Sequence, residues 1–168
     1  MNIFTQPSGV FPVVVADAHC DIPCGIYDPT PAKIAAKTVA RMVMQVHEIK
    51  PLHKITPLAG MDAHAIAAHA NMIARRIAVK EQHAEACKRE LATLWSDFFK
   101  QEHLAKNPEL HDTVWKALKL CSKNKQEVDE DAANQLVAAV DEIAKIFYEV
   151  KGVPERYAAY QTITDKLY

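Results

Sequence analysis

Residues 62–99 read DAHAIAAHANMIARRIAVKEQHAEACKRELATLWSDFF and hold no proline or glycine. Their apolar residues recur at helical spacing and keep to roughly one face of a helix. These residues are Ile66, Ala70, Ile73, Ile77, Ala84, Cys87, Leu91, Leu94 and Phe98. Asp62 is a good N-cap because its carboxylate can accept a hydrogen bond from a first-turn amide. The stretch therefore predicts one very long helix, about 57 Å at ~1.5 Å per residue, or two helices with a kink.

Amphipathic patterns on both sides predict three more helices. The first begins at Thr30 or Pro31 and ends before Pro51, and the others cover residues 108–123 and 126–151. The inward stripe predicted for the first helix consists of Ile34, Thr38, Val39, Met42, Val46 and Ile49. Residues 154–168 also fit a short amphipathic helix, whereas residues 51–60 and 100–107 read as loops. Four amphipathic helices with short connections predict an all-α fold, an antiparallel four-helix bundle.

Composition limits the possible partners. The chain has 168 residues, enough for one domain with a substantial core, and 49% of them are hydrophobic. Lys and Arg number 20 and Asp and Glu number 21, for a net charge of −1, so no bulk field favours nucleic acid or an acidic membrane. No apolar run reaches the ~18 uncharged residues that a membrane span needs. We therefore predict neither nucleic acid nor a membrane as a partner.

A metal-binding hook precedes the first helix. Residues 19–29 read HCDIPCGIYDP and place one imidazole and two thiols within six positions. If the chain is cut before His19, its free amine, its imidazole and the Cys20 backbone nitrogen can all reach an ion bound by the Cys20 sulfur. With the ion, the amine and the Cys20 backbone nitrogen close one five-membered chelate ring. That nitrogen and the Cys20 sulfur close a second. Pro23 restricts φ to about −65°, and the turn returns Cys24 to the fourth position.

Two nitrogens and two sulfurs in a plane, with an imidazole on the axis, do not suit zinc, which prefers a tetrahedron and has no redox chemistry. Such a tetragonal set with an anionic amidate and thiolates suits Ni(II) and makes Ni(III) accessible. Cys20 and Cys24 could instead be a thiol redox pair. Their CxxxC spacing, the absence of a βαβ pattern and the preceding His19 favour ligands. Cys87 and Cys121 fall on apolar helical faces and are expected to be buried free thiols.

Residues 1–18 are interpreted as a leader or propeptide that a maturation protease removes, leaving a hook-plus-bundle domain of residues 19–168. The run VFPVVV followed by ADA resembles the end of a signal peptide, but no Lys or Arg precedes it and Pro12 interrupts it. We therefore expect a cytoplasmic protein, with export by a weak leader left open. The alternative is a disordered tail that stays attached.

The hook sequence resembles that of nickel-containing superoxide dismutases. Three later blocks resemble the family in the same order: KEQHAE at 80–85, LWSDFFK at 94–100 and PELH at 108–111. The resemblance implies an enzyme that converts superoxide to dioxygen and hydrogen peroxide by cycling one nickel ion per subunit between Ni(II) and Ni(III). It implies His19, Cys20 and Cys24 as metal ligands, and a homohexamer.

The resemblance also assigns roles around the hook. It places Tyr27 on the substrate approach, and Asp21 and Pro23 as residues that stabilise the hook. Lys100 matches a lysine near the active site that could attract the anion, although a helix-end lysine can simply be solvated. His83 stands where the family often has an arginine, and we expect it to hydrogen-bond the His19 imidazole or else to pack on its helix. This sequence also differs from the family pattern at Ala35, where the family has an acidic residue, and at Phe98, where the family often has a tyrosine.

Two other classes of function stay open from the sequence. A non-enzymatic nickel- or copper-binding helical module, such as a metal carrier, would need an exchangeable metal and no leader removal. A purely structural helical protein with an incidental CxxxC would bind no stoichiometric metal. Trp95 and Trp115 are expected in the core or at a subunit contact.

Overall fold

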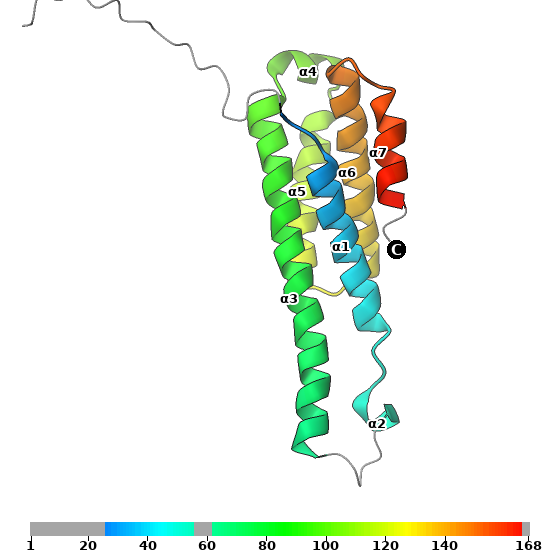
Figure 1. The fold of residues 1–168 in the computed structure, drawn as a ribbon. Coiled ribbons are helices and arrows are strands. Elements are labelled where there is room, and N and C mark those ends of the chain that lie inside the picture. The colour runs from blue at the N-terminus through cyan, green and yellow to red at the C-terminus, as the bar shows by residue number, and fades with distance from the viewer. Residues whose placement is uncertain (1–25, 56–61, 166–168) are drawn as a thin grey trace, which may run out of the picture.

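The fold is built from helices in an antiparallel bundle. The computed structural model describes residues 26–55 and 62–165, which form helices and no strand. The four long helices are α1 (Thr30–His47), α3 (Ala63–Thr93), α5 (Leu110–Gln126) and α6 (Glu130–Val150). They alternate in direction along the chain (Figure 1). The predicted all-α, antiparallel four-helix bundle is confirmed.

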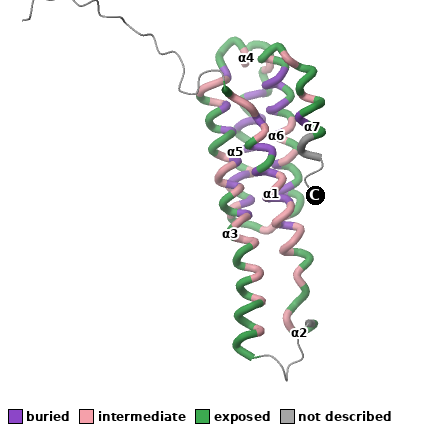
Figure 2. The backbone as a smooth tube through the Cα atoms, viewed as in Figure 1, coloured by how far each residue is buried: buried purple, intermediate pink, exposed green. Residues whose placement is uncertain are grey.

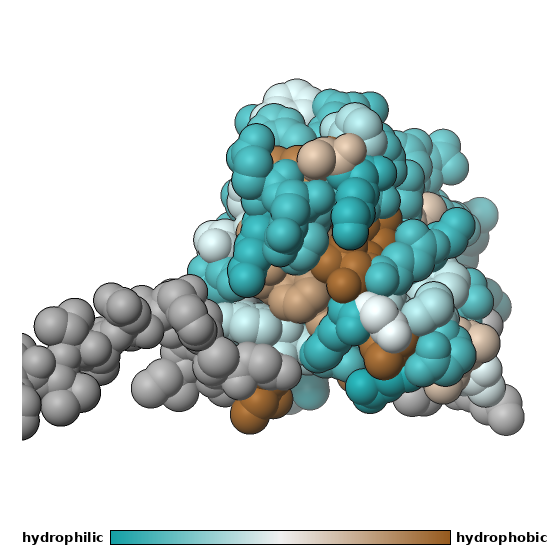
Figure 3. Space-filling model, turned by 90° about the horizontal axis from the view of Figure 1, so that it is seen from above, coloured by the Kyte–Doolittle hydropathy of each residue, from teal (hydrophilic) through white to brown (hydrophobic). Residues whose placement is uncertain are grey.

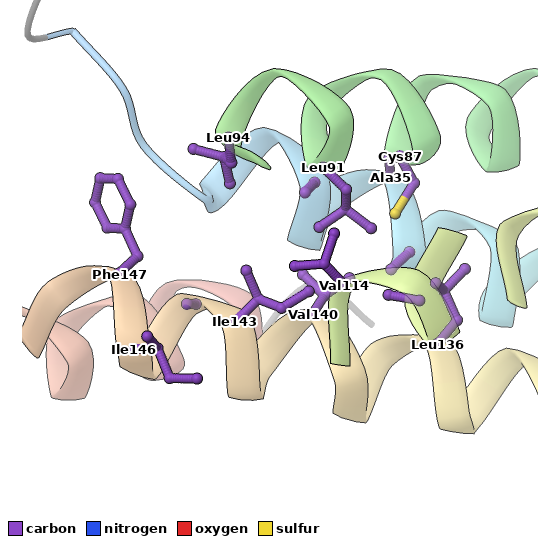
Figure 4. Close-up of a cluster of buried hydrophobic side chains, with 14 of the residues drawn as sticks. Ala35, Cys87, Leu91, Leu94, Val114, Leu136, Val140, Ile143, Ile146 and Phe147 are labelled. Atoms are coloured by element: carbon purple, nitrogen blue, oxygen red, sulfur yellow. The ribbon is translucent and has the colours of Figure 1, made fainter. Parts of the chain in front are cut away.

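The four helices form a closed ring around one core. Helix α1 packs along α3 and α6, and α5 packs along the same two helices. The core receives Ala35 from α1, Leu91 from α3, Val114 from α5 and Ile143 from α6, all buried (Figure 4). Cys87 and Cys121 are fully buried in this core and are not disulfide-bonded, as predicted.

The inward face of α1 differs from the prediction. Ile34 is 44% exposed, and Thr38, Met42 and Val46 are only half-buried. The buried face consists instead of Ala32, Lys33, Ala35, Ala36, Val39, Ala40 and Val43. Small residues dominate this face because close packing between helices needs short side chains, so the larger Ile34 stays outside.

Helix α3 is one continuous helix that extends beyond the bundle. The Asp62 carboxylate caps it by accepting a hydrogen bond from the Ala65 amide at 2.8 Å, as predicted. Its buried residues begin only at Lys80, and Ile66 in the projecting half is 50% exposed. Figure 2 shows this half with exposed and half-buried residues. The predicted single apolar face is therefore buried only where the other helices accompany it.

Short helices occupy the regions predicted as loops. Helix α2 (Leu52–Ile55) lies within the first, and α4 (Gln101–Lys106) within the second, where the His103 ring nitrogen accepts a hydrogen bond from the Lys100 amide at 3.1 Å. Helix α7 (Arg156–Asp165) confirms the predicted tail helix. Helix α6 begins later than predicted, where the Asp129 carboxylate accepts from the Ala132 amide at 3.0 Å. Trp115 is 52% exposed, so the core alternative for it was wrong.

Lys80, from the KEQHAE block, holds two helices together. It is buried, and its ammonium donates hydrogen bonds to the carbonyl oxygens of Asn124, Lys125 and Glu127 at the C-terminal end of α5. The last carbonyls of a helix have no partner within the helix, and the helix dipole favours a cation there. The lysine of this block therefore has a structural role.

Candidate metal centre

The ligand residues predicted from the sequence, His19, Cys20 and Cys24, lie outside the described residues, as do Asp21 and Pro23. The description begins at Ile26, from which the chain runs through Tyr27 and Asp28 into α1. This segment lies at the end of the bundle where α4 crosses (Figure 1). The geometry around residues 26–29, which we call the hook root, is therefore what the structure shows of the centre.

Two contacts attach the hook root to α6. The Asp28 carboxylate accepts a hydrogen bond from the Tyr148 hydroxyl at 3.2 Å and another from the Thr30 amide at 2.8 Å, at the start of α1. The Lys151 ammonium donates to the Tyr27 carbonyl oxygen at 3.0 Å. Burial, together with the nearby Asp28 carboxylate, raises the pKa of Tyr148, so its hydroxyl stays protonated and can donate.

An aromatic cluster contacts the ring of Tyr27. The ring of Phe98 lies 5.9 Å from the Tyr27 ring and 4.3 Å from that of Phe147 on α6. Phe98 is the last residue of a π-helical turn (Leu94–Phe98), in which the Phe99 amide donates to the Leu94 carbonyl at 3.0 Å. Such turns often occur at functional sites. Viewed along the bundle from this end, hydrophobic residues show in a hollow between hydrophilic ones (Figure 3).

Lys100 lies close to this cluster in the chain. It follows Phe98 by two residues, is exposed, and stands immediately before α4. The structure therefore brings Tyr27 and the segment carrying Lys100 to the same end of the bundle.

His83 lies further along α3. It precedes Phe98 by 15 positions, which at ~1.5 Å per residue corresponds to about 22 Å along the helix. The half-buried ring donates from Nδ1 to the Val79 carbonyl oxygen at 2.9 Å, so in the neutral ring Nε2 remains an acceptor. Ala35 is buried and offers no polar side chain.

Sequence reasoning did not single out Asp28, Tyr148 or Lys151. Asp28 carried a local signal, because an Asp just before a Pro-Thr helix start can accept from a first-turn amide. Tyr148 and Lys151 carried none, since their contacts join residues more than 100 positions apart.

The donors of the hook fit nickel. Among the described residues, no group of three His, Cys, Asp or Glu side chains could hold a metal ion. The other two thiols, Cys87 and Cys121, are fully buried, and their mutual contact together with burial raises the pKa of Cys87, so neither offers an accessible thiolate. The donors predicted from the sequence are the two hook thiols and, once the chain is cut before it, the amine and imidazole of His19. This sulfur- and nitrogen-rich set suits a thiophilic, tetragonal ion such as nickel.

Comparison with known proteins decides the family. The family model described as nickel-containing superoxide dismutase matches residues 14–151. The chain belongs to this family. The superoxide dismutase [Ni] of Streptomyces seoulensis is 35% identical over 140 residues, which cover 83% of this chain and 93% of that protein. The corresponding protein of Streptomyces coelicolor is 36% identical with the same coverage.

Solved nickel superoxide dismutases share the fold. The native structure at 1.30 Å aligns with a TM-score of 0.64 at 34% identity, covering 80% of this chain and 99% of that one. A structure with nickel ligation of the oxidised state gives the same TM-score and coverage. The resemblance to the nickel superoxide dismutase family inferred from the hook and the three later blocks is confirmed. Helix α7 lies beyond the matched segment.

Proposed function

We propose that this chain disproportionates superoxide to dioxygen and hydrogen peroxide at one nickel ion per subunit. Two superoxide anions and two protons give one molecule of each product. The observation that carries the proposal is the complete hook, HCDIPCGIYDP, within a family match that covers residues 14–151. The predicted activity, enzyme class and nickel cofactor are confirmed by this membership, and a non-enzymatic carrier is not favoured.

The hook supplies the donors. Cys20 and Cys24 would hold the nickel by their thiolates, Cys20 also by its backbone nitrogen, and His19 by its amine and imidazole. When bound, the ion supplies one-electron redox chemistry by alternating between Ni(II) and Ni(III). Anionic thiolates and an amidate stabilise the higher oxidation state, whereas Asp21 and Pro23 would hold the turn in which these donors lie.

Residues at the end of the bundle would handle the substrate. Superoxide is an anion, and the exposed Lys100 ammonium would raise its local concentration. Tyr27 is half-buried against Phe98, and its hydroxyl would orient water along the approach. His83 lies further along α3, about 22 Å from Phe98 at ~1.5 Å per residue. It would accept a hydrogen bond through Nε2, directly or through water, from the His19 imidazole of a hook that reaches along α3, because its Nδ1 already donates to Val79.

Maturation and assembly belong to the same proposal. Cleavage after Ala18 by a protease would turn the His19 nitrogen from an amide without a basic lone pair into an amine that can bind the ion. We infer a homohexamer from the family resemblance, and the exposed Trp115 and Ile66 offer apolar contact surface. None of the described helices is long and apolar enough to cross a membrane. We propose a cytoplasmic location, with export by a weak leader as the alternative.

Intact mass and metal analysis of the protein from its native host test the proposal. We expect a chain that begins at His19 and carries about one nickel per subunit, together with dismutase activity. An oxidised sample should give a Ni(III) paramagnetic signal with axial nitrogen coupling. A mature protein that retains residues 1–18 with full activity would contradict the cleavage, and a metal-free native protein would contradict the function itself. Sedimentation analysis would test the hexamer.

A further inference from the structure

Helix α7 docks on the bundle by a buried polar contact. It packs against α1 and α6, and Tyr160 is only 2% exposed. The Tyr160 hydroxyl donates to the Asp141 carboxylate of α6 at 3.1 Å. The same carboxylate pairs with the buried Lys33 of α1, whose ammonium lies 5.6 Å from the centre of the Tyr160 ring. The Asp141 carboxylate therefore links α1, α6 and α7.

The docked helix also reaches the residue that binds the hook root. The Tyr160 ring lies 5.8 Å from the Tyr148 ring, which is 3% exposed. The Tyr148 ring also lies 5.3 Å from that of Phe147, at 85° to it. Tyr148 thus contacts two aromatic rings, while its hydroxyl donates to Asp28. A continuous series of contacts runs from α7 through Tyr148 to Asp28, two residues before α1 begins.

We propose that Tyr148 is a positioning residue for the nickel hook and that α7 holds Tyr148 in place. This inference rests on the proposed function. Cys24 precedes Asp28 by four residues, which span at most about 14 Å. The position of Asp28 therefore limits where the Cys24 thiol and the donors before it can go.

A held hook root would strengthen nickel binding through pre-organisation. Metal binding must order the hook, and each residue that is already held reduces the entropy lost in that step. Two attachments act on this segment, the Tyr148–Asp28 hydrogen bond from α6 and the Lys151–Tyr27 hydrogen bond from the residue that follows α6. Tyr148 is buried and Lys151 is exposed. Water therefore competes less with the Tyr148–Asp28 hydrogen bond than with the Lys151–Tyr27 hydrogen bond.

Tyr148→Phe removes the hydroxyl and keeps the ring, which makes it the sharpest variant. In the metal-free protein, we expect exchange of the Thr30 backbone amide with solvent to accelerate about five-fold, because its acceptor Asp28 loses its partner. In a competition with a chelator, we expect the nickel dissociation constant to rise about five-fold. Tyr157→Phe is the matched control on α7, since the Tyr157 hydroxyl accepts from Gln161 of the same helix; it should change neither value.

A second variant tests the role of α7. Tyr160→Ala removes the ring that contacts Tyr148 and should weaken nickel binding in the same direction. If α7 acts through Tyr148, the double variant Tyr148→Phe/Tyr160→Ala should bind nickel no more weakly than the weaker of the two single variants. Additive losses would overturn the role of α7.

The outcomes separate the two levels of the proposal. Wild-type protein that binds no nickel overturns the proposed function, and with it the role of Tyr148. If wild-type protein binds nickel and Tyr148→Phe binds it equally tightly with unchanged Thr30 exchange, only the positioning role is overturned. Circular dichroism of every variant should stay helical, because no substitution introduces a helix breaker, although Tyr160→Ala removes a buried aromatic ring.

Discussion

Replacing Lys80 by Met should cost this protein a large part of its stability without touching the metal hook. The substitution keeps most of the apolar length of the side chain and removes the ammonium that donates to three carbonyl oxygens at the end of α5. Those carbonyls lie where the helix offers no internal partner. The loss should therefore fall on the contact between α3 and α5.

The magnitude follows from the contacts. A hydrogen bond to a charged group contributes about 1.5–3 kcal/mol, and a buried cation at a helix C-terminus up to ~2 kcal/mol. These contributions do not add in full, because one ammonium serves all three acceptors. The Lys80→Met variant also avoids the free-energy cost of burying a charge. We therefore expect the free energy of unfolding to fall by about 2–4 kcal/mol, which for a chain of this size lowers Tm by about 4–16 °C.

Urea unfolding followed by circular dichroism measures this loss, with stability taken from the midpoint and slope. Lys116→Met is the matched control, because Lys116 is an exposed lysine that pairs with Asp112 one turn away on its own helix. We expect the control to lose much less. A Lys80→Met variant no less stable than Lys116→Met would refute the reasoning, and would mean that water replaces the ammonium at the end of α5 without cost.

Three further predictions concern chemistry and pH. Cys20→Ser or Cys24→Ser should abolish dismutase activity while circular dichroism stays unchanged, because a hydroxyl is a harder and less acidic donor; redox turnover in either variant would contradict this. His83→Ala should weaken axial nitrogen coupling and slow turnover. His83→Arg should preserve turnover and flatten any acid limb over about pH 5.5–9, because a guanidinium keeps its charge where an imidazole can change it. An alanine variant with an unchanged spectrum and pH profile would reduce His83 to a packed residue. Burial lowers the pKa of Lys80 in the folded protein below 10.5, its ordinary value. Between the folded and the unfolded pKa of this lysine, the unfolded chain therefore binds more protons than the folded one. The free energy of unfolding of the wild type relative to Lys80→Met should therefore increase with pH in that window, measured at about pH 8 and 10; a decrease would contradict the shift.

Local chemistry explains what could be predicted. The helical period of residues 62–99 depends on neighbours three and four positions apart, and the Asp62 cap depends on one amide three positions on, so both are legible in the sequence. The donor set of the hook is likewise local, because its chelate rings close within adjacent residues. These local features carried the fold class, the family and the nickel prediction.

Tertiary packing decided what the sequence left open. Several faces of α1 are apolar enough to be buried, and only the close approach of its neighbours selected the alanine face over Ile34. Lys80 looked like part of a functional block, yet its partners lie 44 to 47 positions away and make it a helix cap.

The hook combines a local feature, its donor set, with a feature that depends on tertiary packing, the contacts of its root. Its donors follow from eleven consecutive residues, His19 to Pro29, whose covalent connectivity sets which atoms can share one ion. The residue that contacts its root is Tyr148, 120 positions from Asp28, and the Tyr160 ring packs against Tyr148. No periodicity or motif encodes such a contact, because it exists only once α6 and α7 have packed beside the start of α1. The sequence alone therefore predicts which residues bind the metal, whereas only the tertiary structure shows that Tyr148 contacts the root of that segment.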